Sequence, residues 1–200
     1  MKLVDLSSAY QIQKKYTQKN KVIAYKVGAS NYRSSEFFGC EDILLGALDR
    51  DCVYYNKILK DYPLAEVEVV SKILISDSGK EYEVLEHFLG IECPEIVVDN
   101  PDGSPFICVA DNCSAGDLII FQKLDDIEFE IISVYADGDL LISGAMDNLK
   151  FAIDDIIERT FDLIKIHDLP LSSREMLIAT GGITDVFPLE AGMKVEINCE

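Results

Sequence analysis

The chain has 200 residues, with 36 acidic and 18 basic side chains and a formal net charge of −18 at pH 7. Nucleic acids and anionic membranes bind clustered Lys and Arg, so this charge argues against both as partners. With 48% hydrophobic residues the chain can bury a core, and no apolar run approaches the roughly 20 residues of a membrane span. Because the start lacks the long apolar stretch of a signal peptide, we expect a cytoplasmic protein.

Hydrophobic periodicity and turn residues predict the elements of the first half of the chain. In chain order, they are a helix over 7–19, strands over 21–27 and 65–75, a turn at 77–79, a helix over 81–89 and a strand over 95–98.

The second half is predicted to be richer in strands. We expect a turn at 100–103, strands over 106–110, 118–123, 128–135 and 140–143, a hairpin turn at 136–139, an amphipathic helix over 147–164, and strands over 176–179 and 194–198. Together these elements predict a β-rich α+β fold with few helices, not an alternating parallel fold.

The cysteines and histidines do not point to a zinc site or a disulfide framework. None of the six cysteines forms a CxxC pair, and the two histidines, His87 and His167, lie far from any such pair. Zinc ribbons and small secreted domains have regular cysteine spacing that is missing here. We expect most of the cysteines to be small buried hydrophobic residues.

Two glutamates on one predicted strand are the first candidates for chemistry. Residues two apart on a strand point to the same face, so Glu66 and Glu68 would project together. Two such charges repel, which favours either a solvated strand face or a cation between them. A third carboxylate would complete an oxygen site for magnesium or manganese. Glu86, Glu92 and Glu95 all follow, and Glu95 is best placed, at the start of a predicted strand.

Lys26 lies within the apolar strand IAYKVG. It is either a solvent-facing lysine on a half-buried strand or a functional one, and the residues alone leave both open. Beside a metal-bound carbonyl, a lysine could pair with a substrate carboxylate or move a proton.

Two loops carry small polar residues and glycine. The loop 111–116 (DNCSAG) could bind an anion through its amides and hydroxyl, or be an ordinary loop. The segment 180–184 (TGGIT) could be a bend, permitted by glycine, that brings backbone close to a ligand. Neither matches a nucleotide-binding motif.

Eight segments follow one another in the order of a known family pattern. They are AYQIQ, IAYKVGAS, FFGCEDILLGAL, AEVEV, PEIVV, VADNCSAG, LLISG and MLIATGGITDVFPLEAGMKVEI. The chain resembles the 2-oxopent-4-enoate hydratase / 4-oxalocrotonate decarboxylase group of the fumarylacetoacetate hydrolase superfamily, from Ala9 to Ile197.

The resemblance implies a mixed β-roll core with a few peripheral helices, in a single catalytic domain over residues 1–200 with a short N-terminal lead-in. It implies Mg²⁺ or Mn²⁺ held by Glu66, Glu68 and Glu95, with Lys26 as the catalytic residue beside the substrate. The substrate-binding residues that it implies are Ser30, Asn112, Ser114 and Thr184.

The activity implied by the resemblance is that of a divalent-metal-dependent lyase on a small 2-oxo or 2-hydroxydienoate acid, with hydration favoured over decarboxylation. Acylpyruvate hydrolysis or tautomerisation is an alternative, weakened because hydrolases of the superfamily use an early histidine and none precedes His87 here. A catalytically reduced subunit that binds a partner enzyme is another. The resemblance also implies a homo-oligomer and a role in the breakdown of aromatic compounds.

The loops depart from the family pattern more than the carboxylates do. Cys113 and Ala115 replace an alanine and a serine of the family's DNASSG loop, and Gly182 and Asp185 replace a serine and a glycine of its GSLTG loop. An aspartate near an anionic substrate disfavours binding unless a metal or a lysine offsets its charge. We therefore expect the metal ligands to be retained, whereas the loops leave the identity of the substrate open.

Overall fold

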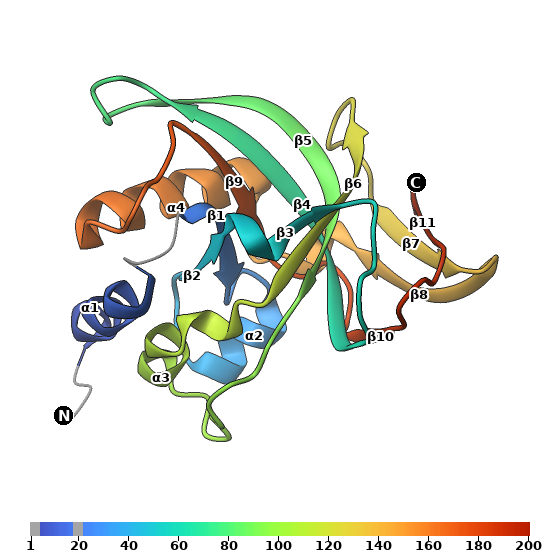
Figure 1. The fold of residues 1–200 in the computed structure, drawn as a ribbon, viewed down its shortest axis with the longest axis horizontal. Coiled ribbons are helices and arrows are strands. Elements are labelled where there is room, and N and C mark those ends of the chain that lie inside the picture. The colour runs from blue at the N-terminus through green and yellow to red at the C-terminus, as the bar shows by residue number, and fades with distance from the viewer. Residues whose placement is uncertain (1–4, 18–21) are drawn as a thin grey trace.

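The computed structural model describes residues 5–17 and 22–200, which form a mixed sheet, a small second sheet and four α-helices (Figure 1). In the large sheet the strands lie in the order β2-β1-β9-β4-β5-β6-β3, and β10 pairs with β4 beside this path. The pairs β1–β9 and β3–β6 are parallel, and the other pairs are antiparallel. The strands are β1 (Val22–Gly28), β2 (Leu44–Asp49), β3 (Val53–Tyr55), β4 (Tyr62–Ile75), β5 (Tyr82–Cys93), β6 (Asp117–Leu124), β9 (Glu175–Ala179) and β10 (Phe187–Leu189).

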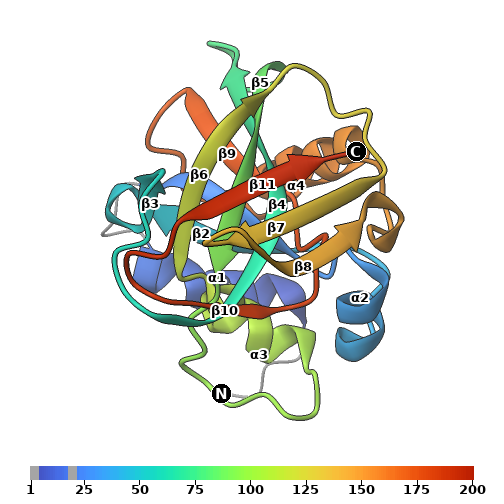
Figure 2. The same cartoon turned by 90° about the vertical axis from the view of Figure 1, so that its right-hand side faces the viewer.

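The small sheet lies against one side of the large one (Figure 2). Its order is β11-β7-β8, from β7 (Ile131–Ala136), β8 (Asp139–Ala145) and β11 (Val195–Cys199). The helices are α1 (Leu6–Thr17), α2 (Tyr32–Phe38), α3 (Pro105–Ala110) and α4 (Ile153–His167), with 3₁₀ turns at Arg50–Cys52, Asn112–Ser114 and Met146–Asn148. This architecture confirms the predicted α+β class. None of the helices in the described part of the chain has the length and hydropathy needed to cross a bilayer.

Successive side chains of β4 point to opposite faces of the large sheet. Val67 and Val69 point into the main hydrophobic core and are fully buried. The alternate positions place Glu68 and then Val70 on the opposite face. There Val70 packs in a second, smaller apolar cluster with residues of β1, β2, β6 and β9. The carboxylates therefore continue an apolar face toward one end of the sheet.

The hairpin of β4 and β5 contains a bulge that sets its register. Near the turn, Ile75 pairs with Tyr82 and Ile73 pairs with Val84. The register shifts between Lys72 and Ile73, so that farther along Glu66 lies opposite Glu92. A one-residue shift moves a strand's side chains to the other face of the sheet. The bulge therefore puts Glu92 on the face that carries Glu66.

Three of the predicted elements are wrong. The predicted helix over 81–89 is part of β5, because pairing with β4 overrides the helix preference of its Glu and Leu residues. The predicted strand over 95–98 is irregular chain without strand pairing, and Ile96 and Val97 are exposed. The predicted strand over 106–110 is helix α3, which begins with Pro105 at its first turn and is capped by the Ser104 hydroxyl.

The other predicted elements are present with shifted ends. Helix α4 begins at Ile153, six residues after the predicted start of 147, and buries Ile156, Ile157 and Phe161 along its apolar side. The sequence analysis did not predict α2, β2, β3 or β10. The predicted helix end at Lys19 and the predicted strand start at Lys21 lie outside the described residues.

Candidate metal and substrate site

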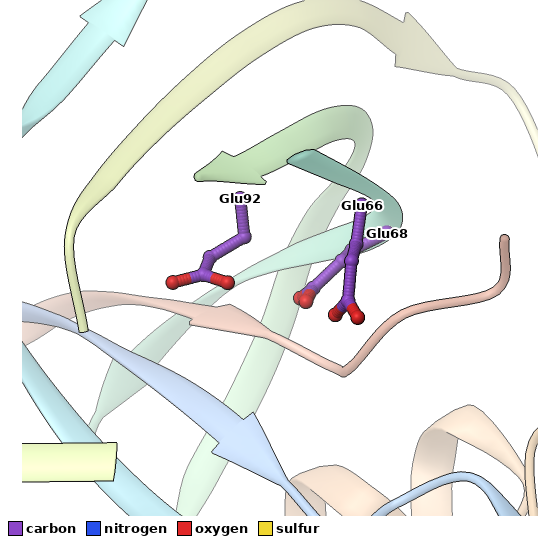
Figure 3. A group of neighbouring side chains, drawn as sticks. All are labelled: Glu66, Glu68 and Glu92. Atoms are coloured by element: carbon purple, nitrogen blue, oxygen red, sulfur yellow. The ribbon is translucent and has the colours of Figure 1, made fainter. Parts of the chain in front are cut away.

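Three glutamates from the two strands of the β4–β5 hairpin converge at one end of the large sheet (Figure 3). Glu66 and Glu68 extend from β4 and Glu92 extends from β5. One carboxylate oxygen of each lies within 4.8 Å of the others. We call these three residues the carboxylate cluster.

The carboxylate cluster lies in the interior and lacks enough hydrogen-bond donors. Glu68 is 1% exposed and Glu92 is 0% exposed. Glu68 Oε1 and both carboxylate oxygens of Glu92 have no hydrogen-bond partner among the described residues. A buried carboxylate without donors is unfavourable, and three carboxylates this close together also repel one another. Oxygen ligands of this kind suit a hard divalent cation, so the donor set fits Mg²⁺ or Mn²⁺.

Burial changes the pKa values of the carboxylate cluster. Burial raises the pKa of Glu92 to about 7, although Lys26 acts in the opposite direction. Burial and the neighbouring Glu92 raise the pKa of Glu68 well above its usual range. Burial also raises the pKa of Glu66. A divalent cation would offset the charges that burial disfavours.

Lys26 extends from β1 toward the same carboxylates. Its Nζ lies 3.4 Å from Glu92 Oε2 and donates a hydrogen bond to the carbonyl oxygen of Cys113 at 3.1 Å. Burial alone would lower the pKa of this lysine, but the three glutamates together raise it above its usual value. Lys26 is therefore a buried, positively charged side chain held beside the carboxylate cluster.

A glycine bend after β9 brings backbone against the carboxylate cluster. The N–H of Gly181 donates to Glu68 Oε2 at 2.9 Å. Gly181 has φ +102°, and a Cβ on it would lie 1.7 Å from the Ser30 hydroxyl. A Cβ on Gly182 would lie 2.6 Å from Glu66 Oε2. Gly181 is therefore required by close approach, and a side chain at position 182 would displace the Glu66 carboxylate.

Two adjoining cavities lead to the carboxylate cluster. The inner cavity, of about 200 Å³, is lined by Lys26, Ser30 and Ser114 among others. The outer cavity, of about 920 Å³, is lined by Thr184 and Asp185 among others. Glu66 and Gly182 line both cavities. A ligand in the outer cavity could therefore extend one end inward to the carboxylates.

The structure groups Glu92, and not Glu95, with Glu66 and Glu68. Glu95 lies beyond the end of β5 and is exposed, and its N–H donates to the carbonyl of Ser114. The third carboxylate of the group is thus Glu92, where the sequence analysis expected Glu95. The cause is the extended strand β5, whose register with β4 places Glu92 directly opposite Glu66.

The predicted substrate residues divide between the cavities and the scaffold. Ser30 is 1% exposed, lines the inner cavity, and has no hydrogen-bond partner for its hydroxyl among the described residues. Ser114 lines the same cavity. Thr184 lines the outer cavity, and its hydroxyl oxygen accepts the N–H of Val67 at 3.1 Å.

Asn112 has a structural contact instead. Its Oδ1 accepts the N–H of Ala47 at 2.7 Å, and its Nδ2 donates to the Ala47 carbonyl at 2.8 Å. Asn112 does not line either cavity. It therefore fixes the 111–116 loop to β2, and through Cys113 it helps to position Lys26.

The sequence analysis did not select Arg33 or Asn31. Arg33 forms an ion pair with Asp185 at the edge of the outer cavity. Asn31 caps α2 and donates from Nδ2 to the Gly182 carbonyl at 3.0 Å. The only sequence signal for Arg33 was the replacement of a family glycine by Asp185, because the added negative charge favours a cation nearby.

Neither histidine lines the two cavities. His87 Nδ1 lies 2.9 Å from the Ser71 hydroxyl, and the His167 ring stacks on Tyr10. Both histidines therefore have partners within the fold, away from the two cavities.

Solved structures with similar folds are known. Over 98% of this chain and 82% of the other, it superposes with TM-score 0.75 and 17% identity on a 4-oxalocrotonate decarboxylase from Pseudomonas putida G7 complexed with magnesium and adipate. A fumarylpyruvate hydrolase from Pseudomonas aeruginosa, in complex with Mn²⁺ and pyruvate, matches with TM-score 0.57 and 15% identity over 90% of this chain and 85% of the other. A 5-carboxymethyl-2-hydroxymuconate delta-isomerase from Mycobacterium smegmatis matches with TM-score 0.56 and 15% identity over 90% of this chain and 75% of the other.

No protein-family model matches the sequence, and no curated protein matches it. The similarity to the solved structures is nevertheless extensive, and it agrees with the family pattern of the ordered sequence motifs. The chain therefore has the fold of the fumarylacetoacetate hydrolase superfamily, as the motifs predicted.

Proposed function

We propose that this protein is a divalent-cation-dependent lyase that acts on a small 2-oxo carboxylic acid. The observation that carries the proposal is the carboxylate cluster beside Lys26, in which one oxygen of each glutamate lies within 4.8 Å of the others and three oxygens of Glu68 and Glu92 have no hydrogen-bond partner among the described residues. The fold neighbours support it, since they are complexed with calcium, magnesium or Mn²⁺ and with acetate, adipate or pyruvate. Glu66, Glu68 and Glu92 would hold the ion, with Mg²⁺ or Mn²⁺ as the expected metal.

A bound cation at this position would supply Lewis-acid stabilisation of the negative charge that develops on the 2-oxo group. Lys26 would pair with the substrate carboxylate or transfer a proton, because its ammonium lines the inner cavity and remains charged. The Ser30 hydroxyl would donate a hydrogen bond to substrate, since it has no partner among the described residues. The bend at Gly181 would hold Glu68 in place through its N–H.

Among the possible reactions, water addition to a 2-hydroxydienoate is the first to test, and decarboxylation is the alternative. Hydrolysis is disfavoured because neither histidine lines the cavities, which leaves Lys26 as the candidate for proton transfer. We further propose that the chain forms one catalytic domain. A homo-oligomer, a partner enzyme and a role in the breakdown of aromatic compounds stay predictions.

The proposal is tested by calorimetric titration of Mn²⁺ into the protein, with and without oxalate, for wild type and Glu68→Ala. Oxalate chelates metal as a 2-oxo acid enolate would, and it requires no knowledge of the substrate. We expect the wild type to bind Mn²⁺, oxalate to tighten that binding, and the variant to lose both. A wild type that is folded and binds no Mn²⁺ would refute the proposal and favour a role as a binding subunit.

If Mn²⁺ and oxalate bind, the reaction type is assigned from products. Hydration of a 2-hydroxydienoate removes the absorbance of the conjugated acid without releasing carbon dioxide, whereas decarboxylation releases one carbon dioxide for each substrate consumed. The same assay on Glu68→Ala serves as the control for activity outside this site.

A further inference from the structure

The two cavities contain two cationic side chains at opposite ends. Among the described lining residues, Lys26 is the only Lys or Arg of the inner cavity and Arg33 is the only one of the outer cavity. Lys26 is buried beside the carboxylate cluster, whereas the side chain of Arg33 is 79% exposed on α2. A ligand that extends through both cavities would therefore meet a positive charge near each end.

Arg33 opposes the negative charge of the outer cavity. The other charged residues that line it are Glu36, Glu66 and Asp185. An acidic mouth on a protein of net charge −18 repels an anionic substrate unless a cation offsets it. Arg33 is the cation placed to do so, because it is the only Lys or Arg among the described residues that line this cavity.

The ion pair of Arg33 with Asp185 leaves the guanidinium available. Of the Arg33 nitrogens, Nη1 alone donates a hydrogen bond to Asp185, and it does so to one carboxylate oxygen. Guanidinium has five N–H donors in a planar fork that matches a carboxylate. Ion pairs between exposed side chains are weak, so an incoming carboxylate can bind beside Asp185 or displace it.

The size of the outer cavity leaves room for a second substrate group. Its volume of about 920 Å³ adjoins the inner cavity of about 200 Å³ at Glu66 and Gly182. A 2-oxo acid group chelated at the carboxylate cluster would occupy the inner end, and the rest of the molecule would extend past Thr184 toward Arg33.

We propose that Arg33 binds a second carboxylate at the far end of the substrate, so that the site selects dicarboxylic 2-oxo acids over monocarboxylic ones of equal length. This inference rests on the proposed function, since it takes the carboxylate cluster as the anchor of the 2-oxo acid end. Arg33 is then a specificity residue, distinct from the ligands that hold the cation.

The test compares two probes that differ only at the far end. The Mn²⁺-loaded protein is titrated with 2-oxoadipate and with 2-oxohexanoate, and both dissociation constants are measured by calorimetry. We expect the wild type to prefer the diacid by about fivefold, the upper end of the gain from one charge-assisted contact at an exposed guanidinium. In Arg33→Met the diacid should bind only as well as the monoacid, whose own affinity stays within about twofold.

Two further variants sharpen the test. Asp185→Asn removes the competing carboxylate, so we expect it to tighten diacid binding and leave the monoacid nearly unchanged. Arg159→Gln is the matched control, since Arg159 is also an exposed helical arginine paired with an aspartate but lines neither cavity. The control should keep the wild-type preference for the diacid.

The outcomes separate this inference from the proposed function. If Mn²⁺ and oxalate bind but wild type and Arg33→Met show the same ratio of the two affinities, the second carboxylate site is refuted and the proposed function stands. If the wild type binds no Mn²⁺, the proposed function fails and the inference fails with it. A diacid preference that disappears in Arg33→Met and persists in Arg159→Gln supports both.

Discussion

The inner and outer ends of this site are built from different kinds of structure. The carboxylate cluster lies on two paired strands, is buried, and is held by the glycine bend and Lys26. The outer cavity is edged by helix α2, the 182–186 segment and the irregular chain after β5, where Arg33, Asp185 and Ile96 are exposed. Paired strands keep side chains in a fixed register, whereas an exposed edge tolerates substitution.

The difference matches two of the four loop departures from the family pattern, whereas Cys113 and Ala115 lie in the loop beside Lys26. Gly182 and Asp185 lie where the outer cavity begins, while Glu66, Glu68 and Lys26 keep the pattern at the inner end. A change at the inner end would leave a buried charge unpaired, which is strongly destabilising. A change at the outer end alters mainly which ligand fits. On the proposed function, the inner end would carry the chemistry and the outer end would select the substrate.

Two glutamates on either side of the end of β5 provide the most direct test of how the inner end is assigned. We expect Glu92→Gln to lower Mn²⁺ affinity by about 100-fold or more, because it removes an anionic oxygen from the carboxylate cluster. Glu95→Gln should leave the affinity unchanged, since Glu95 is exposed and outside the cluster. Calorimetric titration of both variants measures the effect. A larger loss in Glu95→Gln than in Glu92→Gln would contradict the assignment of the inner end.

Substitution of Lys26 should affect binding of the acid without weakening binding of the cation. In Lys26→Met a positive charge leaves the carboxylate cluster, so we expect Mn²⁺ affinity not to fall. Affinity for oxalate on the Mn²⁺-loaded protein should fall by about tenfold, because the anion loses its buried partner. Lys123→Met, which removes an exposed lysine paired with Glu86, is the control. Equal oxalate affinity in Lys26→Met and wild type would rule out this role.

The glycine bend lies at the boundary between the inner and outer ends of the site. A Cβ at Gly182 would lie 2.6 Å from Glu66 Oε2, so Gly182→Ala must displace this carboxylate. We expect Mn²⁺ affinity to fall several-fold, by on the order of fivefold, because ligand orientation controls affinity. Gly28→Ala is the control, since its nearest neighbours would be 3.8 Å away. The hypothesis fails if both variants bind Mn²⁺ as the wild type does.

The smallest expected effect concerns pH and the metal-free protein. The pKa of Glu92 is about 7 in the folded protein, against a usual value of 4.5. Between these values the native state holds a proton that the unfolded state has released, so stability falls as pH rises through this window. We expect Glu92→Gln to reduce that fall by on the order of 1 kcal/mol. Urea unfolding of both proteins with EDTA, from about pH 4.5 to about pH 7, measures it; identical slopes would contradict a buried, protonated Glu92.

Much of the inner end could be predicted from local sequence. The alternation of β4 places Glu66 and Glu68 on one face, and this follows from the period of a strand alone. The adjacent glycines at 181 and 182 predict a close backbone approach, since each excludes a Cβ. Lys26 within an apolar strand was likewise visible as a candidate. Each of these signals depends on residues close together in the chain.

Tertiary structure decides which residue supplies the third carboxylate of the cluster. If the register near the turn, where Ile75 faces Tyr82, continued unchanged, Ile91 would lie opposite Glu66. The bulge between Lys72 and Ile73 shifts the pairing by one residue and brings Glu92 there instead. A bulge is set by packing of the whole sheet, so the local pattern favoured Glu95 wrongly.

The sequence by itself determined the α+β class, the two carboxylates of β4, the lysine of β1 and the glycine bend, because periodicity and steric limits act over a few residues. Only the tertiary structure decided that Glu92 completes the carboxylate cluster, that Asn112 is bound to Ala47, and that Arg33 meets Asp185. These contacts join segments distant in sequence, and their free energy depends on packing and strand register that no local pattern specifies.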